Sequence, residues 1–143
     1  MNLENYIRTV PDFPIEGIQF KDITTLLANP EAFNHSIDLL SELVSDADII
    51  IGLDARWFIF WRAVAYKLKK PFVLIRKKWK LPYKTIDISY SLEYGSDSFS
   101  MHIDSINPWE KIAIVDDLLA TGWTAKAAID LIEKSWWIVD SLN

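Results

Sequence analysis

The chain contains no cysteine, and it has four glycines, two methionines and two histidines among its 143 residues. The absence of cysteine excludes disulfide bonds and thiolate metal sites, and it is compatible with a reducing compartment. No apolar run approaches the length of a membrane span, and the first residues, Met1-Asn-Leu-Glu-Asn-Tyr6, lack the basic and apolar regions of a signal peptide. We therefore expect a cytoplasmic protein that makes no membrane contact.

An excess of positive charge is also missing, because 15 lysines and arginines face 20 aspartates and glutamates, for a net charge of -5. Proteins that bind nucleic acid in general carry a basic surplus along one face, so we expect no nucleic-acid partner. With 50% hydrophobic and 24% charged residues, the composition is typical of a folded globular protein. The length predicts a single domain over residues 1–143.

What the chain does have is an apolar, β-rich segment, residues 112–115, that ends in Asp116 and Asp117 and leads through small and hydroxyl residues into a helical pattern. This order predicts a strand, a loop and a helix. The amides of residues 120–124 would lie at the helix N-terminus, where unpaired N–H groups favour an anion. Because two carboxylates would repel a phosphate, they need a neutral polyol or a cation beside it. The loop predicts a sugar-phosphate site, and an ordinary strand end with an aspartate cap is the alternative.

Two more apolar runs, residues 48–52 and 72–75, flank a helical pattern from about Phe58 to Leu68 and predict a βαβ unit. Arg56 follows the first run, at the edge where open α/β sheets bind ligands, and its planar fork can grip a pair of diphosphate oxygens. The basic run at 76–80 follows the second strand and leaves the same edge, so we expect phosphate-directed groups to converge there.

The C-terminal half has two further patterns. Residues 85–103 alternate between apolar and polar side chains on both sides of residues 95–98, which predicts a β-hairpin with its turn at those four residues. After the helix at 124–133, the apolar residues 138–142 predict another strand.

Several segments in order carry a family resemblance. Val-Asp-Asp-Leu-Leu-Ala-Thr-Gly-Trp-Thr at 115–124 is similar to the ribose-phosphate loop of type I phosphoribosyltransferases. Five other segments match the members of this family that act on adenine: Val10-Pro-Asp-Phe-Pro14, Gly17-Ile-Gln-Phe-Lys-Asp-Ile-Thr24, Leu53-Asp-Ala-Arg-Trp-Phe58, Arg76-Lys-Lys-Trp-Lys-Leu-Pro82 and Ser91-Leu-Glu-Tyr-Gly95. The resemblance implies an α/β fold, with a central, mostly parallel sheet flanked by helices and a β-hairpin flap that closes over the reacting centre.

The same resemblance implies a purine-salvage enzyme that transfers the phosphoribosyl group of 5-phosphoribosyl 1-diphosphate to adenine, giving AMP and pyrophosphate. It assigns proton transfer at the purine to Glu93 and the ribose hydroxyls to Asp116 and Asp117. The residues implied to bind the diphosphate and the 5'-phosphate are Arg56, Arg76, Lys77, Lys80, Ala120, Thr121, Gly122, Trp123 and Thr124, and those implied to bind the base are Phe20 and Lys21. Mg²⁺ is expected to arrive with the substrate rather than in a site of its own, and a homodimer is implied.

Alternatives remain at several of these positions. From the sequence alone Phe20 is better interpreted as a core residue of a short strand, and the family resemblance reverses that interpretation. Glu93 has the alternative of an outward-facing strand residue. Another purine base could replace adenine. If the tryptophan at position 123 is genuine, its indole would fill the phosphate site, and the chain would be a regulator that responds to phosphoribosyl diphosphate or an inactive scaffold.

One departure from the family concerns tryptophan. All seven tryptophans stand where the resemblance leads us to expect glycine: Trp57, Trp61, Trp79, Trp109, Trp123, Trp136 and Trp137. Glycine serves turns and close backbone approach, which the bulkiest side chain cannot supply. Our hypothesis is that the gene uses UGA for glycine and that the sequence was translated with tryptophan at that codon. The family also continues beyond the position of Asn143, so we expect a chain that lacks its C-terminal end.

Overall fold

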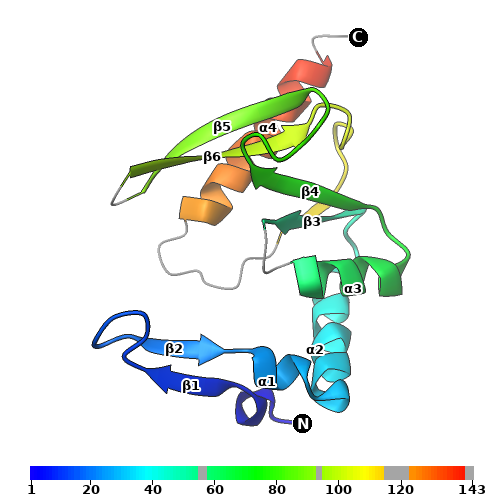
Figure 1. Cartoon of the computed structure of the whole chain (residues 1–143). Helices are drawn as coiled ribbons and strands as arrows, with labels where there is room; N and C mark the ends of the chain where they lie inside the picture. The colour runs from blue at the N-terminus through cyan, green and yellow to red at the C-terminus, as the bar shows by residue number, and fades with distance from the viewer. Residues whose placement is uncertain (55–57, 93–94, 115–122, 141–143) are drawn as a thin grey trace. The chain divides into compact units, whose positions relative to one another are not determined.

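The computed structural model describes residues 1–54, 58–92, 95–114 and 123–140, and these residues form two compact units, Met1–Leu43 and Val44–Asn143 (Figure 1). The expected single domain stays a prediction. Among the described helices, none combines the length and the apolar character that a bilayer crossing requires.

The first unit is a two-stranded sheet followed by helices. A short 3-10 helix, η1 (Leu3–Tyr6), precedes the antiparallel strands β1 (Arg8–Pro11) and β2 (Gln19–Asp22). Helix α1 (Thr24–Leu27) then leads to α2 (Pro30–Leu43). The side chain of Asn29 accepts a hydrogen bond from the backbone N–H of Ala32 at 2.9 Å, which caps α2 ahead of a proline in its first turn.

The second unit is a five-stranded sheet in the order β5-β6-β4-β3-β7. Its elements are β3 (Ile49–Leu53), α3 (Phe58–Leu68), β4 (Phe72–Lys77), β5 (Thr85–Leu92), β6 (Gly95–His102), β7 (Ile112–Ile114) and α4 (Trp123–Asp140). Strand β3 runs parallel to both β4 and β7, whereas β6 runs antiparallel to β4 and β5. The expected α/β fold is therefore confirmed, and the sheet is mixed because the hairpin β5–β6 adds antiparallel strands to a parallel centre.

The core of this unit lies on both faces of β3, in which all five residues are buried. On one face, Ile51 and Leu53 belong to a cluster that includes Ala128 and Leu131 of α4. On the other, Gly52 lies against aromatic side chains, since a Cβ built there would stand 2.7 Å from the Phe72 ring and 2.9 Å from the Phe58 ring. Helices α3 and α4 thus pack on opposite faces of β3, and strands β4 and β7 pair with β3 in a defined register.

Two boundaries predicted from the sequence are wrong. Strand β6 begins at Gly95, which pairs with Leu92, so residues 95–98, expected to form the turn, are paired strand residues. Helix α4 continues to Asp140, so residues 138–140 are helical and not the start of a strand. Serines are compatible with a strand as well as with a turn, so their presence at residues 95–98 does not decide between the two. An apolar run that follows a helix does not by itself end that helix.

Candidate functional site

Three parallel strands bring their carboxyl ends to one edge of the sheet. Strands β3, β4 and β7 end at Leu53, Lys77 and Ile114, so the chain leaves all three at the same edge (Figure 1). The sequence predicted that the basic run and the acidic loop converge at this edge, and the acidic loop itself lies outside the described residues. The expected site residues that lie outside the described residues are Arg56, Glu93, Asp116, Asp117, Ala120, Thr121 and Gly122.

Arg76 is the best-defined cation at this edge. Its Nε lies 3.3 Å from Oδ2 of Asp54, the residue that directly follows β3, and the Asp54 side chain is 9% exposed against 31% for Arg76. The backbone N–H of Asp54 donates to the carbonyl of Ile75 at 3.0 Å, so the carboxylate is held by the sheet itself. The guanidinium also donates a hydrogen bond from Nη1 to the carbonyl of Lys80 at 3.5 Å.

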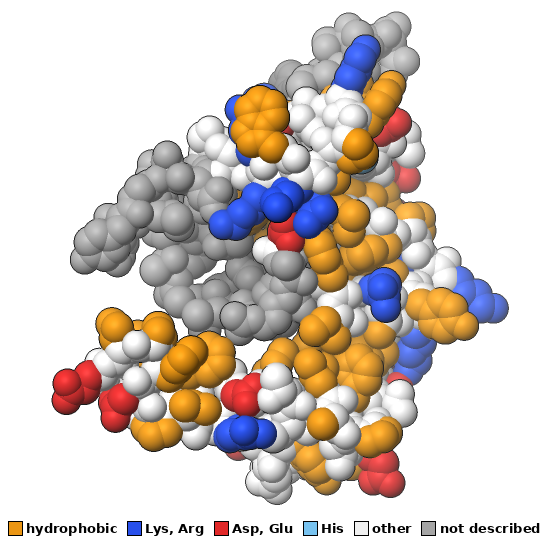
Figure 2. All heavy atoms as spheres, viewed as in Figure 1, with side chains coloured by type: hydrophobic (Ala, Val, Ile, Leu, Met, Phe, Trp, Pro, Cys, Tyr) orange, Lys and Arg blue, Asp and Glu red, His pale blue; other side chains and the backbone are white. Residues whose placement is uncertain are grey.

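The basic run continues from β4 into a tight turn. The N–H of Lys80 donates to the carbonyl of Lys77 at 3.2 Å, and Trp79, at the third position of this turn, has a φ of 71°. Lys77 and Lys80 are exposed, as binding to a ligand from solvent requires. Figure 2 shows lysine and arginine side chains gathered in one band on the face in view, with an acidic side chain against them.

Lys78 takes no part in this convergence. Its Nζ lies 3.5 Å from Oδ2 of Asp87 on β5. Burial acts to raise the pKa of the Asp87 carboxyl, but the hydroxyls of Ser100 and Thr85 and the ammonium of Lys78 outweigh it and lower the pKa below its ordinary value. Lys78 therefore ties the basic turn to strand β5 of the hairpin.

Helix α4 supplies the described part of the expected phosphate loop. It begins at Trp123 and includes Thr124, and its first turn contains no acidic residue. The unpaired N–H groups at the start of an 18-residue helix favour an anion. The described part of the loop is therefore compatible with phosphate.

The two residues expected to bind the base lie in the first unit. Phe20 is half-buried and packs edge-on against Phe13, with ring centroids 5.2 Å apart, so it is not part of the buried core. Lys21 is exposed, and its Nζ donates to Oγ1 of Thr9 on the neighbouring strand at 2.8 Å. Their role in base binding stays a prediction.

Sequence reasoning missed Asp54 as a member of the site. The sequence shows an acidic residue one position beyond a buried strand, but it pairs with Arg76 only because Leu53 lies opposite Ile75 in the parallel register. A register between strands more than twenty positions apart is not visible in a single sequence. Within the described ranges, no group of three or more His, Asp or Glu side chains is placed to hold a metal ion.

Comparison with known proteins identifies the family. The model of the phosphoribosyl transferase domain matches residues 22–135. The adenine phosphoribosyltransferase of Thermosipho africanus is 53% identical over 137 residues, which cover 94% of this chain and 81% of that protein. The chain belongs to the adenine phosphoribosyltransferase family. The resemblance carried by the six sequence segments is thereby confirmed.

Solved structures of this family have the same fold. The adenine phosphoribosyltransferase of Thermoanaerobacter pseudethanolicus matches with a TM-score of 0.85 at 44% identity, covering 92% of this chain and 78% of that one. The Saccharomyces cerevisiae protein, crystallised with an imino-altritol bisphosphate and adenine, matches with a TM-score of 0.85 at 37% identity, covering 93% and 79%. The chain thus spans about four fifths of the length of these relatives.

Proposed function

We propose that this chain catalyses the purine-salvage reaction in which adenine displaces pyrophosphate from 5-phosphoribosyl 1-diphosphate to give AMP. The observation that carries the proposal is the membership of the family, at 53% identity to an adenine phosphoribosyltransferase over 94% of the chain. The arrangement of the sheet edge supports it, because Arg76, Lys77 and Lys80 leave β4 beside the carboxyl ends of β3 and β7.

In this proposal the reaction depends on positioning and on charge neutralisation. Adenine attacks the anomeric carbon while diphosphate leaves, and positive charge develops on the ribose. Asp116 and Asp117 hold the ribose hydroxyls and favour that positive charge. The 5'-phosphate binds to the amides and hydroxyls of residues 120–124, at the N-terminus of α4.

The leaving group and the base have their own sets of residues. Arg56, Arg76, Lys77 and Lys80 stabilise the negative charge that accumulates on the leaving diphosphate, and an arginine does so through two parallel hydrogen bonds. Phe20 stacks on the purine with Lys21 beside it, and Glu93 exchanges a proton with the ring. Closure of the hairpin β5–β6 keeps water from taking the place of adenine.

We propose Mg²⁺ as a companion of the substrate. The residues that the structure describes offer no cluster of carboxylates for it, and Asp54 already faces Arg76. The ion would arrive with the substrate and would neutralise part of the leaving-group charge. We also propose a homodimer, which sedimentation velocity tests directly, and a cytoplasmic location.

The function is tested by incubating the chain with adenine, 5-phosphoribosyl 1-diphosphate and Mg²⁺, and measuring AMP and pyrophosphate in equal amounts. Hypoxanthine, guanine and xanthine serve as competitors in the same assay. Preferential turnover of one of these bases would assign the chain to a different purine. Absence of product with every base would contradict catalysis.

The non-catalytic alternative rests on Trp123, which begins α4 at the expected phosphate site. Calorimetric titration of 5-phosphoribosyl 1-diphosphate into the chain and into its Trp123→Gly variant distinguishes the non-catalytic alternative from the enzyme. If the indole obstructs the phosphate, the glycine variant binds more tightly. Equal affinities would contradict the steric argument and leave the enzyme as the better interpretation.

A further inference from the structure

Asp54 is an acidic residue at an edge that is expected to bind an anion, which calls for a physical reason. Its side chain is 9% exposed, and its Oδ2 is 3.3 Å from Nε of Arg76. A nearly buried carboxylate is tolerated when a cation and hydrogen bonds offset its desolvation. Asp54 is the carboxylate that contacts Arg76 among the described residues, and its backbone is fixed to Ile75 in the sheet.

The contact with Asp54 is made through Nε, one of the three nitrogens of the Arg76 guanidinium. Asp54 engages Nε, and the carbonyl of Lys80 accepts from Nη1 at 3.5 Å. Nη2 makes no hydrogen bond within the described part of the chain, so the guanidinium retains donors for an incoming anion. The Arg76 side chain as a whole is 31% exposed, so it is not sealed from solvent.

We infer that Asp54 is a positioning residue, which fixes the guanidinium of Arg76 in a single orientation before the diphosphate group binds. The inference rests on the proposed function, because it takes the diphosphate as the ligand of Arg76. An unrestrained arginine has many rotamers and loses them on binding, so a side chain ordered in advance binds more tightly. The contact with Lys80 extends the effect to the turn that holds a second cation.

Charge and positioning predict opposite results, which makes the inference testable. If Asp54 acted only as a negative charge near an anion, both Asp54→Asn and Asp54→Ala would tighten diphosphate binding. If it positions Arg76, Asp54→Asn keeps an oxygen that accepts from Nε and stays close to wild type. Asp54→Ala then raises the KM for 5-phosphoribosyl 1-diphosphate by about tenfold, with the KM for adenine unchanged.

The experiment is a double-mutant cycle on the full chain. Asp54→Ala, Arg76→Ala and the double variant are compared in steady-state kinetics and in calorimetric titrations with inorganic pyrophosphate and Mg²⁺. Because Asp54 acts through Arg76, Asp54→Ala should have no further effect once Arg76 is alanine. Asp46→Ala is the control, since Asp46 pairs with Lys111 at 3.9 Å ahead of β3, at the opposite end of that strand.

The outcomes separate this inference from the proposed function. If the effects of Asp54→Ala and Arg76→Ala are independent and multiply in the double variant, the inference is overturned. It is also overturned if Asp54→Ala lowers thermal stability and changes the KM for 5-phosphoribosyl 1-diphosphate and the KM for adenine alike. Failure of the wild-type chain to bind pyrophosphate would overturn it too. If the chain binds pyrophosphate and the cycle shows coupling, but adenine is not converted, the inference stands and the proposed function fails.

Discussion

At the scale of single residues, two tryptophans adopt a backbone that favours glycine. Trp79 and Trp109 have φ values of 71° and 72°, and their side chains are 89% and 93% exposed. Trp109 follows Pro108, and proline before a residue with positive φ is the order of a type II β-turn, in which glycine takes the later position. Asp12 and Lys69 also have positive φ, so these conformations are not specific to tryptophan, and the hypothesis that UGA encodes glycine stays a prediction. Trp61, 1% exposed in α3, is accommodated as an indole.

Trp109→Gly should therefore raise the free energy of unfolding. The substitution removes the strain of a side chain at positive φ, which exceeds the entropy cost of glycine by roughly 0.5–1 kcal/mol. Trp109→Ala is the matched control, because it removes the same indole but keeps a Cβ and should bring no gain. Urea unfolding measures both variants, and a glycine variant less stable than the alanine variant would contradict the argument.

Asp87 should contribute to the loss of stability in acid. Its pKa in the folded chain lies below the ordinary value of 3.8, so its contribution to stability is complete above about pH 4 and is lost as the pH falls through the folded pKa. Asp87→Asn removes this dependence. Urea unfolding at a series of pH values should show a shallower decline below about pH 4 for the variant, and parallel declines would refute the assignment.

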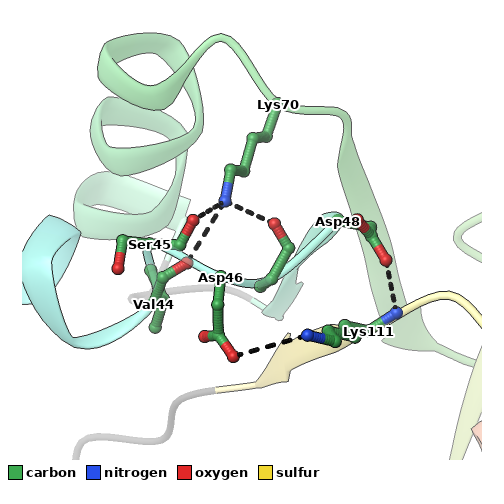
Figure 3. Close-up of polar contacts among 7 residues, drawn as sticks. Val44, Ser45, Asp46, Asp48, Lys70 and Lys111 are labelled. Atoms are coloured by element: carbon green, nitrogen blue, oxygen red, sulfur yellow. Dashed lines mark hydrogen bonds and ion pairs between the residues drawn. The ribbon is translucent and has the colours of Figure 1, made fainter.

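At the scale of elements, one lysine closes the turn between α2 and β3. The Nζ of Lys70 donates to the carbonyls of Val44 at 3.4 Å, Ser45 at 2.5 Å and Ala47 (Figure 3). Val44 and Ala47 are buried, so these carbonyls have little access to water. An ammonium with several donors is suited to this position because it can satisfy several carbonyls at once, and the carbonyl of Val44 also accepts from the backbone N–H of Ala47 at 3.1 Å.

Lys70→Met should destabilise the chain by about 2 kcal/mol, because it keeps the aliphatic stem and removes the ammonium donor from the carbonyls of Ser45 and Ala47. The free energy of unfolding in urea measures the loss. Lys84→Met, at an exposed lysine, controls for the change in net charge. A loss no larger than that of the control would show that water replaces the ammonium.

The elements that the sequence predicted well are those whose pattern is local. The helix at 58–68 matches α3, and the buried run at 48–52 matches β3 within a residue, because hydrophobic period and length decide both. The hairpin turn and the end of α4 depend on pairing and packing between distant residues, and these were wrong. If positions 136 and 137 were glycines, the helix would have a reason to end there and the predicted strand a place to begin.

At the scale of the whole molecule, the sequence predicted the parallel strands and the edge at which they end, but it did not predict the ion pairs between them. The basic run starts at the edge where β3 and β7 also end, which follows from the parallel order of these strands. The Asp54–Arg76 pair and the diversion of Lys78 to Asp87 depend on register, which no single segment encodes.

The predicted single domain has a direct test, because all seven tryptophans lie after residue 56 and thus in the second compact unit. Tryptophan fluorescence reports the unfolding of that unit, while far-UV circular dichroism reports both units. One domain should give coincident transitions in urea. A dichroism change without a fluorescence change would show that residues 1–43 unfold on their own.

The hairpin β5–β6 is joined to β4 through a short ladder whose two registered pairs are Arg76 with Ser100 and Lys77 with Phe99. The strand that carries the proposed lid therefore also carries Arg76 and Lys77, which we propose to bind diphosphate. In that proposal, lifting the lid would pull on both residues, so release of AMP and release of pyrophosphate would be coupled.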